Sequence, residues 1–160
     1  MTRHLVIGIG NTLMQDDGIG LRCIEHLERT RELPPSVTCL DVGTEATLLL
    51  EELHAGDDLI LIDAMTGAPG QPPGTLVELE RNEIQNTPFG LGLSPHSPNL
   101  AGRLAVADLL GVPPANVRLL GLVTQSCALG TQLTPALAKA LPTLANAVLD
   151  AIERHPRRAG

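Results

Sequence analysis

Short apolar runs alternate along the chain with longer amphipathic segments. Residues 4–8, 37–40, 59–62 and 117–123 are rich in aliphatic side chains, and each run predicts a strand. Residues 4–8 are expected to be buried, and 59–62 to form a central strand of the sheet. Between the runs, apolar residues recur at helical spacing. This predicts helices from about residue 18 to before the prolines at 34–35, over 46–54, from 98 to about 110, and from 135 to about 155. The alternation predicts a three-layer α/β domain with a mostly parallel sheet.

A further strand is predicted at residues 75–79, where apolar and polar side chains alternate. The Gly- and Pro-rich segment 65–73 that precedes it is too short to hold a crossover helix, because a parallel return needs a dozen or more residues. This fourth strand is therefore predicted to run antiparallel, near an edge of the sheet. The segment 81–98 contains several Gly and Pro residues and is predicted to be a loop.

Length and composition indicate one domain with an aliphatic core. The 160 residues, 43% of them apolar, leave little for a second core, so residues 1–160 are predicted to form one domain, with a basic tail at 154–160. One Phe and no Tyr or Trp exclude an aromatic platform for single-stranded nucleic acid. The net charge of −7 disfavours nucleic acid and anionic membranes as partners.

The cysteines and the apolar runs favour a cytoplasmic protein. Cys23, Cys39 and Cys127 lie far apart and form no CxxC pair, and an odd number cannot pair fully, so a reducing compartment is expected. The N-terminal apolar run, residues 5–9, is too short for a signal peptide or a membrane span. Cys23 and Cys39 are predicted to be small side chains of the core.

Polar side chains gather at the predicted carboxyl ends of the strands, where open α/β sheets bind ligands. Carboxylates follow each of the first three strands, at Asp16 and Asp17, at Asp41 and at Asp63, and His96 lies in the loop before the third helix. Carboxylate oxygen and imidazole nitrogen suit a divalent metal such as Zn, Ni, Mn or Fe, so these residues are a candidate metal site. Further polar candidates are Asn11, Gln15, Thr44, Thr124, Gln125 and Ser126.

Each of these acidic residues also has a structural explanation. Asp16 or Asp17 can cap the first helix, and Asp41 can be an ordinary turn residue. His96 can be an exposed loop histidine. Asp63 directly follows four buried aliphatic residues, where a carboxylate is costly unless it is paired, hydrogen-bonded or bound to a metal. A dinucleotide site is disfavoured, because the glycines of residues 8–10 lack the third glycine of that fingerprint.

Residues 8–20, GIGNTLMQDDGIG, resemble the N-terminal signature of the nickel–iron hydrogenase maturation endopeptidases. Three shorter segments, 40–44 (LDVGT), 60–64 (ILIDA) and 94–96 (SPH), are similar to further segments of that family and occur in the same order. Gly130 followed by 133–135 (LTP) resembles the entry to the last helix of the family. Together these segments span nearly the whole chain.

The resemblance implies an endopeptidase that removes a short C-terminal extension from the precursor of the hydrogenase large subunit, after nickel has been inserted into it. The nickel carried by the substrate is then the recognition signal, and the family's ligands match Asp17, Asp63 and His96. Zn or Cd is expected to fit the same site in vitro. Asp16 and Asp41 are candidate catalytic residues, as a base or by orienting the ligands. A nucleophilic Cys127 lacks an obvious histidine partner.

The resemblance also implies a sheet order of 2-1-3-5-4, with Asp17 and Asp63 meeting at the switch point between strands one and three. Hydrogenase assembly chaperones are possible further partners, and a monomer is expected. The chain departs from the family after strand five, where a Pro-Glu-like segment is expected and residues 123–126 read VTQS. A non-catalytic metal-sensing chaperone or binding module for hydrogenase assembly is the alternative function.

Overall fold

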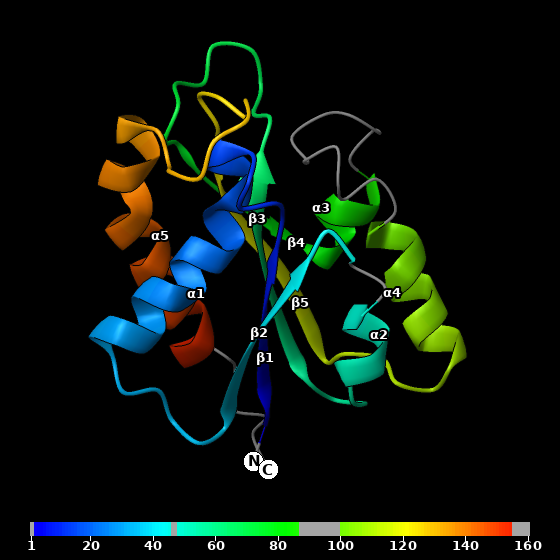
Figure 1. Cartoon of the computed structure of the whole chain (residues 1–160). Helices are drawn as coiled ribbons and strands as arrows, with labels where there is room; N and C mark the ends of the chain where they lie inside the picture. Colours follow the sequence, from blue (N-terminus) through cyan, green and yellow to red (C-terminus); the bar gives the residue numbers. More distant parts are fainter. Residues whose placement is uncertain (1, 46–47, 87–99, 155–160) are drawn as a thin grey trace.

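A five-stranded sheet runs through the middle of the molecule, with helices on both faces (Figure 1). The computed structural model describes residues 2–45, 48–86 and 100–154. The strands are β1 (His4–Ile9), β2 (Val37–Gly43), β3 (Asp58–Met65), β4 (Leu76–Glu80) and β5 (Asn116–Val123). Their order is β2-β1-β3-β5-β4, and β4 pairs antiparallel with β5 while the other described pairs are parallel. The predicted strand order and the antiparallel fourth strand are confirmed.

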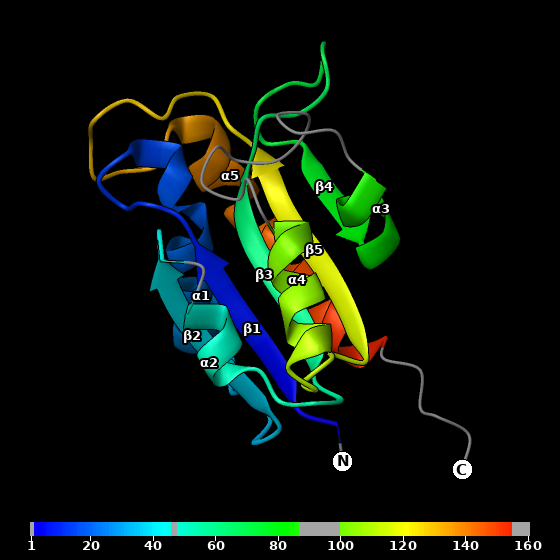
Figure 2. The ribbon, with the colours of Figure 1, turned by 90° about the vertical axis from the view of Figure 1, so that its right-hand side faces the viewer.

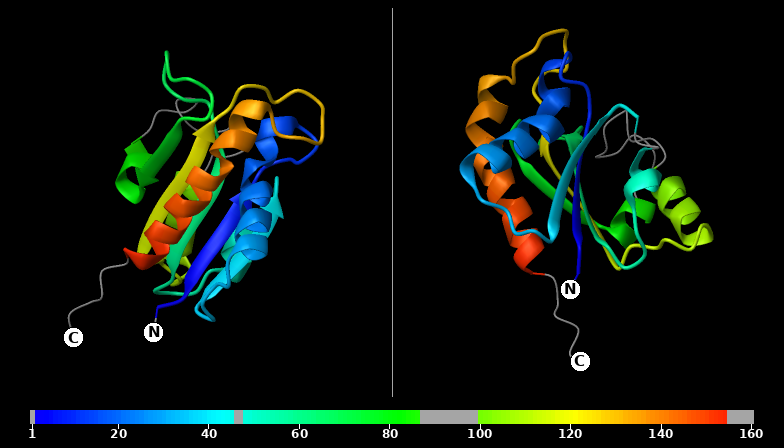
Figure 3. Two further views of the ribbon diagram at one scale, coloured as in Figure 1. Left: turned by 90° about the vertical axis from the view of Figure 1, so that its left-hand side faces the viewer. Right: turned by 60° about the horizontal axis from the view of Figure 1, so that its bottom comes forward.

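The helices form the two outer layers. The helices α1 (Ile19–Thr30) and α5 (Pro135–Glu153) lie side by side on one face, as the left view of Figure 3 shows. The other face carries α2 (Leu48–Glu52), α3 (Arg81–Asn86) and α4 (Leu100–Leu109) (Figure 2). A short 3-10 helix, η1 (Gln15–Gly18), leads directly into α1. None of the described helices is long and apolar enough to cross a membrane.

Several predicted boundaries were wrong. The segment predicted to be a loop begins with α3, because Ile84 is only 2% exposed and fastens this short helix to the core. Asp63 lies inside β3 rather than after it, since the pairing with β5 continues as far as Met65. Asp41 likewise lies inside β2, which runs on to Gly43. The predicted start of the third helix at 98, residues 46–47 of the second and the tail beyond Arg154 lie outside the described residues.

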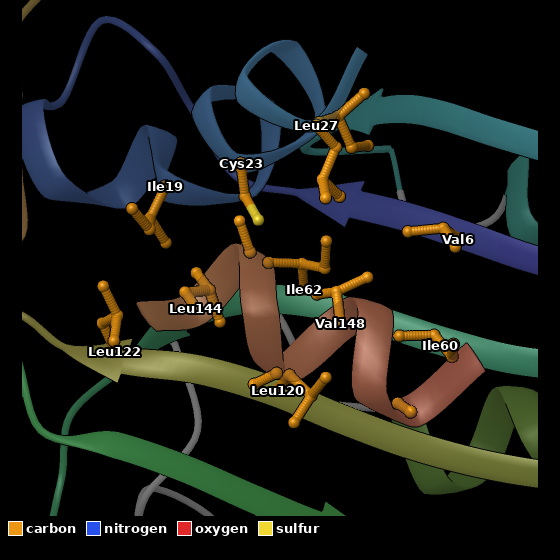
Figure 4. Close-up of a cluster of buried hydrophobic side chains, with 14 of the residues drawn as sticks. Val6, Ile19, Cys23, Leu27, Ile60, Ile62, Leu120, Leu122, Leu144 and Val148 are labelled. Carbon is orange, nitrogen blue, oxygen red and sulfur yellow. The ribbon is translucent and has the colours of Figure 1, made fainter. Parts of the chain in front are cut away.

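An aliphatic cluster joins the sheet to α1 and α5 (Figure 4). Alternate residues of a strand point to the same face, so one set of strand side chains meets these two helices. The main labelled members are Val6, Ile60, Ile62, Leu120 and Leu122 from the strands and Ile19, Cys23, Leu27, Leu144 and Val148 from the helices. Burial raises the pKa of Cys23 to about 12, so its thiol behaves as a small apolar group, as predicted.

An ion pair fixes the start of β1 at the end of the sheet where the parallel strands begin. Arg3 donates two hydrogen bonds to the Asp57 carboxylate, from Nε at 3.0 Å and from Nη2 at 2.6 Å. The backbone N–H of His54 donates a third at 2.7 Å. Burial raises the pKa of Asp57, but the hydrogen bonds from Arg3 and His54 outweigh burial and hold the pKa below its usual value.

Asp57→Asn is expected to lower the free energy of unfolding by about 1–2 kcal/mol at pH 7. Because the pKa of Asp57 is lower in the folded chain, its contribution is complete above the unfolded pKa of about 3.9 and is lost as the pH falls through the folded pKa. Urea unfolding of both proteins at a series of pH values measures this difference. If the difference in free energy of unfolding between the two proteins stays constant down to pH 2, the charge of Asp57 does not cause that difference.

Candidate active site

The candidate site lies at the carboxyl ends of the parallel strands, the upper end of the molecule in Figure 1. The chain leaves β1 toward β2 on one side and reaches β3 on the other, so the switch point of the sheet falls between β1 and β3. In open α/β sheets such a point is where ligands bind. Asp17 belongs to η1, which follows β1 and lies against β3, and Asp63 belongs to the carboxyl half of β3.

The glycines of the 8–20 motif allow this close packing. A Cβ at Gly20 would lie 2.6 Å from the carbonyl oxygen of Ile9 and 2.7 Å from that of Ile62, so any side chain there would push α1 away from both strands. Gly10 has φ of +132°, and a Cβ there would overlap the carbonyl oxygen of Asp17. These glycines therefore allow α1 to pack close to the sheet. This packing places η1 at the carboxyl end of β3.

Asp17 and Asp63 are both buried carboxylates. Asp17 is 2% exposed, and its Oδ2 accepts a hydrogen bond of 2.9 Å from the backbone N–H of Asn11. Asp63 is 1% exposed, and its Oδ1 accepts one of 2.8 Å from the backbone N–H of Ala64. Burying a carboxylate costs several kcal/mol unless charge or hydrogen bonds compensate, and each of these two carboxylates accepts a backbone hydrogen bond.

Asp16 points elsewhere and holds the site together. Its carboxylate is completely buried and accepts hydrogen bonds from the backbone N–H groups of Gln125 (2.9 Å), Ser126 (3.1 Å) and Thr134 (2.8 Å). The Thr134 hydroxyl lies 3.0 Å from Oδ1 and 2.8 Å from Oδ2 of the same carboxylate. Asp16 thus joins η1 to the loop after β5 and to Thr134, the N-cap residue of α5. The N-cap residues of η1 and α1 are Met14 and Gly18, so neither Asp16 nor Asp17 occupies the N-cap position that the capping explanation gave it.

Gln15, directly before the two acidic residues, has an unusual backbone conformation. Its φ of +44° lies in the left-handed region, and among the described residues it is the only one other than glycine that does so. The Gln15 backbone N–H donates to the carbonyl of Gly130 at 2.8 Å, and the Ser126 hydroxyl donates to its side-chain oxygen at 2.6 Å. Strained residues held by several hydrogen bonds cluster at functional sites, which agrees with the position of Gln15.

Asp41 and His96 are the remaining candidate site residues. Asp41 is exposed, and its Oδ1 accepts a 2.9 Å hydrogen bond from the Gly43 N–H, the kind of local bond expected of a turn residue. His96 lies outside the described residues. Within the described part of the chain, no group of three or more His, Cys, Asp and Glu residues is placed to hold a metal ion. The ligand assignments of Asp17, Asp63 and His96 stay predictions.

Cys127 is the cysteine nearest to the acidic residues. Burial raises the pKa of its thiol, a hydrogen bond with Thr124 opposes this, and the carboxylates of Asp17 and Asp16 raise the pKa further. Because the thiolate is the reactive form, a raised pKa is unfavourable for a nucleophile. The surroundings of Cys127 therefore do not favour its thiol as a nucleophile.

The fold and the site define an α/β protein with buried carboxylates at the switch point of a 2-1-3-5-4 sheet. The chain belongs to the hydrogenase maturation protease family, a family of peptidases, whose model matches residues 21–151. It is 34% identical to the hydrogenase 2 maturation protease of Escherichia coli, with 98% of each chain covered. It is 37% identical to the hydrogenase expression/formation protein HupD of Rhodobacter capsulatus over 74% of this chain, but only 56% of that protein's length is covered.

Solved structures agree with this assignment. The hydrogenase maturating endopeptidase HybD from Escherichia coli matches with a TM-score of 0.81 and 33% identity, covering 95% of this chain and 93% of that one. The [NiFe] hydrogenase maturation protease HybD from Thermococcus kodakarensis, at 23% identity and a TM-score of 0.76 over 93% of this chain and 98% of that one, shares the fold. The family suggested by the 8–20 motif and the short segments that follow it is confirmed.

Proposed function

We propose that this chain is the endopeptidase that removes the C-terminal extension of a [NiFe]-hydrogenase large-subunit precursor, and that it recognises the nickel already inserted into that precursor. The observation that carries the proposal is the pair of buried carboxylates, Asp17 and Asp63, at the switch point of a maturation-protease fold. Carboxylate oxygens are suitable ligands for a divalent cation. His96 is proposed as the third ligand.

The proposed ligand set leaves coordination positions open, as a metal that remains attached to its substrate requires. Nickel held there would polarise the scissile carbonyl or a water molecule. Asp17 and Asp63 would bind and orient the metal-bearing segment of the precursor. Of the two candidate bases, Asp41 is exposed, whereas both oxygens of Asp16 already accept hydrogen bonds. Asp16 is therefore proposed to position the loops, which leaves Asp41 as the candidate base.

The remaining parts of the proposal concern the setting of the reaction. We expect it to take place in the cytoplasm, with the chain acting as a monomer on the folded, nickel-loaded precursor. Hydrogenase assembly chaperones are proposed as further partners, because they would present that precursor. The net charge of −7 supports a protein partner rather than nucleic acid or an anionic membrane. Zn or Cd is proposed as a substitute for nickel at the site in vitro.

Cleavage of purified precursor tests the proposed function. The chain is incubated with nickel-loaded and with nickel-free precursor, and mass spectrometry of the large subunit identifies a new C-terminus. We expect cleavage at one position in the loaded precursor and none in the nickel-free form. Binding of the loaded precursor without any cleavage would instead establish a non-catalytic metal-sensing module. Equal cleavage of both forms would contradict recognition through nickel.

A further inference from the structure

The two acidic residues of the first motif follow a tight turn that depends on the backbone of Gln15. The N–H of Asp17 donates to the carbonyl of Met14 at 3.1 Å, which closes a four-residue turn with Gln15 and Asp16 at its centre. We call residues 14–17 the acidic turn. Its first central residue is left-handed, with φ of +44° at Gln15, a conformation that is most common for glycine, asparagine and aspartate. A glutamine adopts this conformation only where its surroundings hold it there.

The loop after β5 supplies the contacts that hold Gln15. The backbone N–H of Gln15 donates to the Gly130 carbonyl at 2.8 Å. The side-chain Oε1 accepts a 2.6 Å hydrogen bond from the Ser126 hydroxyl, whose oxygen in turn accepts one of 3.3 Å from the Ala128 N–H. A Cβ at Gly130 would lie 3.0 Å from Cγ of Gln15, so the glutamine side chain packs directly on this glycine. One loop therefore fixes both the backbone and the side chain of Gln15.

The acidic turn directs its two carboxylates to different places. The Asp16 carboxylate accepts hydrogen bonds from backbone N–H groups of the loop after β5. The Asp17 carboxylate accepts one from the N–H of Asn11, just beyond the end of β1, and so lies beside the switch point of the sheet. Because Gln15 directly precedes this pair, a rotation about its backbone bonds would move both carboxylates. The conformation of Gln15 therefore determines where Asp17 points.

The hydroxyl that holds Gln15 belongs to the segment where the chain departs from its family. Residues 123–126 read VTQS, where the resemblance to the family leads us to expect a Pro-Glu-like segment. A proline or an ionised glutamate has no side-chain donor, so neither could give the hydrogen bond that Ser126 gives to Gln15. This chain thus has a contact between the loop and the acidic turn that the expected segment would lack.

We propose that Gln15 is a positioning residue: held by Ser126, it fixes the acidic turn so that Asp17 faces the metal carried by the precursor. This inference rests on the proposed function, in which Asp17 is a ligand of that metal. A ligand that is already oriented loses little freedom when the metal binds, so the affinity for the precursor is higher. In this role Gln15 acts through Asp17, and its contribution is expected in precursor binding rather than in the cleavage step.

Two variants remove the hydrogen bond from opposite ends. Gln15→Met keeps the length of the side chain and its packing on Gly130 but lacks the amide oxygen, and Ser126→Ala lacks the hydroxyl. With the nickel-loaded precursor, each is expected to raise the KM about tenfold and to leave kcat unchanged, because a misdirected Asp17 weakens binding of the metal-bearing segment. The double variant should have the same KM as each single variant, since all three lack the same bond.

Ser126→Thr and Gln85→Met complete the series. Threonine keeps a hydroxyl, so Ser126→Thr should restore a KM close to that of the unmodified chain. Gln85→Met makes the same chemical change at an exposed position of α3 and should not alter the KM. A purely structural role of Gln15 predicts a different result. Part of the protein would then be unfolded, which lowers the apparent kcat and the melting temperature but leaves the KM unchanged.

The outcomes separate this inference from the proposed function. If the unmodified chain does not cleave the loaded precursor, the proposed function and this inference fail together. If it cleaves, and Gln15→Met and Ser126→Ala both keep its KM, the positioning role is refuted while the function stands. A raised KM in Gln15→Met that Ser126→Ala does not share would also refute it, because the hydrogen bond between the two residues would not be the cause.

Discussion

Asp17→Asn is expected to abolish processing of the nickel-loaded precursor and to leave the fold intact. An asparagine has nearly the same shape, and its side-chain oxygen can still accept the hydrogen bond that the Asn11 N–H donates to Asp17. It lacks the negative charge that, under the proposed function, would hold a divalent cation, so metal recognition and cleavage are both expected to be lost. A loss of at least about 100-fold in kcat/KM is expected, corresponding to about 2.7 kcal/mol of transition-state stabilisation.

Cleavage of the loaded precursor and a pull-down of the same precursor measure the two parts of this effect. Glu25→Gln is the matched control, because it removes one carboxylate from the exposed side of α1 and should change neither. Asp63→Asn should behave like Asp17→Asn if the two residues are ligands of one ion. Full cleavage by Asp17→Asn would overturn its assignment as a ligand.

The general fold could be predicted from the sequence because its determinants are local. Four apolar runs indicated strands, and the shortness of the segment before β4 required an antiparallel return. The helix α3 was missed because a helix of six residues, Arg81–Asn86, has too few turns to show a periodic pattern. It is stabilised by the contact of Ile84 with the core, which the sequence does not reveal.

The candidate site could be predicted only in part. The positions of Asp17 and Asp63 followed from the rule that ligands bind at the carboxyl ends of strands. The environment of Asp16 did not, because its partners lie 109 to 118 positions away in the chain. A cap on the first helix was the explanation available from neighbouring residues alone. Long-range contacts of this kind depend on the finished topology, so a single sequence carries no local signal for them.

The packing role of the 8–20 motif also could not be predicted from the sequence. Its glycines resemble a family signature, but the reason for them appears only in three dimensions, where Gly20 lies against the carbonyl oxygens of Ile9 and Ile62. One of these contacts is local and the other crosses to β3, more than forty residues along the chain. The motif is therefore a packing requirement that places Asp17 at the switch point.

Asp16→Asn is expected to lower the free energy of unfolding by about 2–4 kcal/mol, the largest effect on stability predicted for this chain. The carboxylate accepts hydrogen bonds from backbone N–H groups on both of its oxygens, at Thr134 on one and at Gln125 and Ser126 on the other. An asparagine must turn its NH2 group toward one of these sides, where donor would face donor. At least one buried N–H group then loses its acceptor. Urea unfolding measures the change.

Thr134→Val is the matched control, because it removes only the hydroxyl and keeps the backbone N–H bond to Asp16, so a loss of about 1 kcal/mol is expected. Cleavage assays then distinguish positioning from base catalysis at Asp16. If Asp16 is a positioning residue, Asp16→Asn should raise the KM for the precursor, since the loop after β5 loses its attachment to η1 beside the candidate site. A base predicts a loss of about 100-fold or more in kcat with unchanged binding. Unchanged stability together with unchanged KM would contradict the role that the hydrogen bonds of Asp16 assign to it.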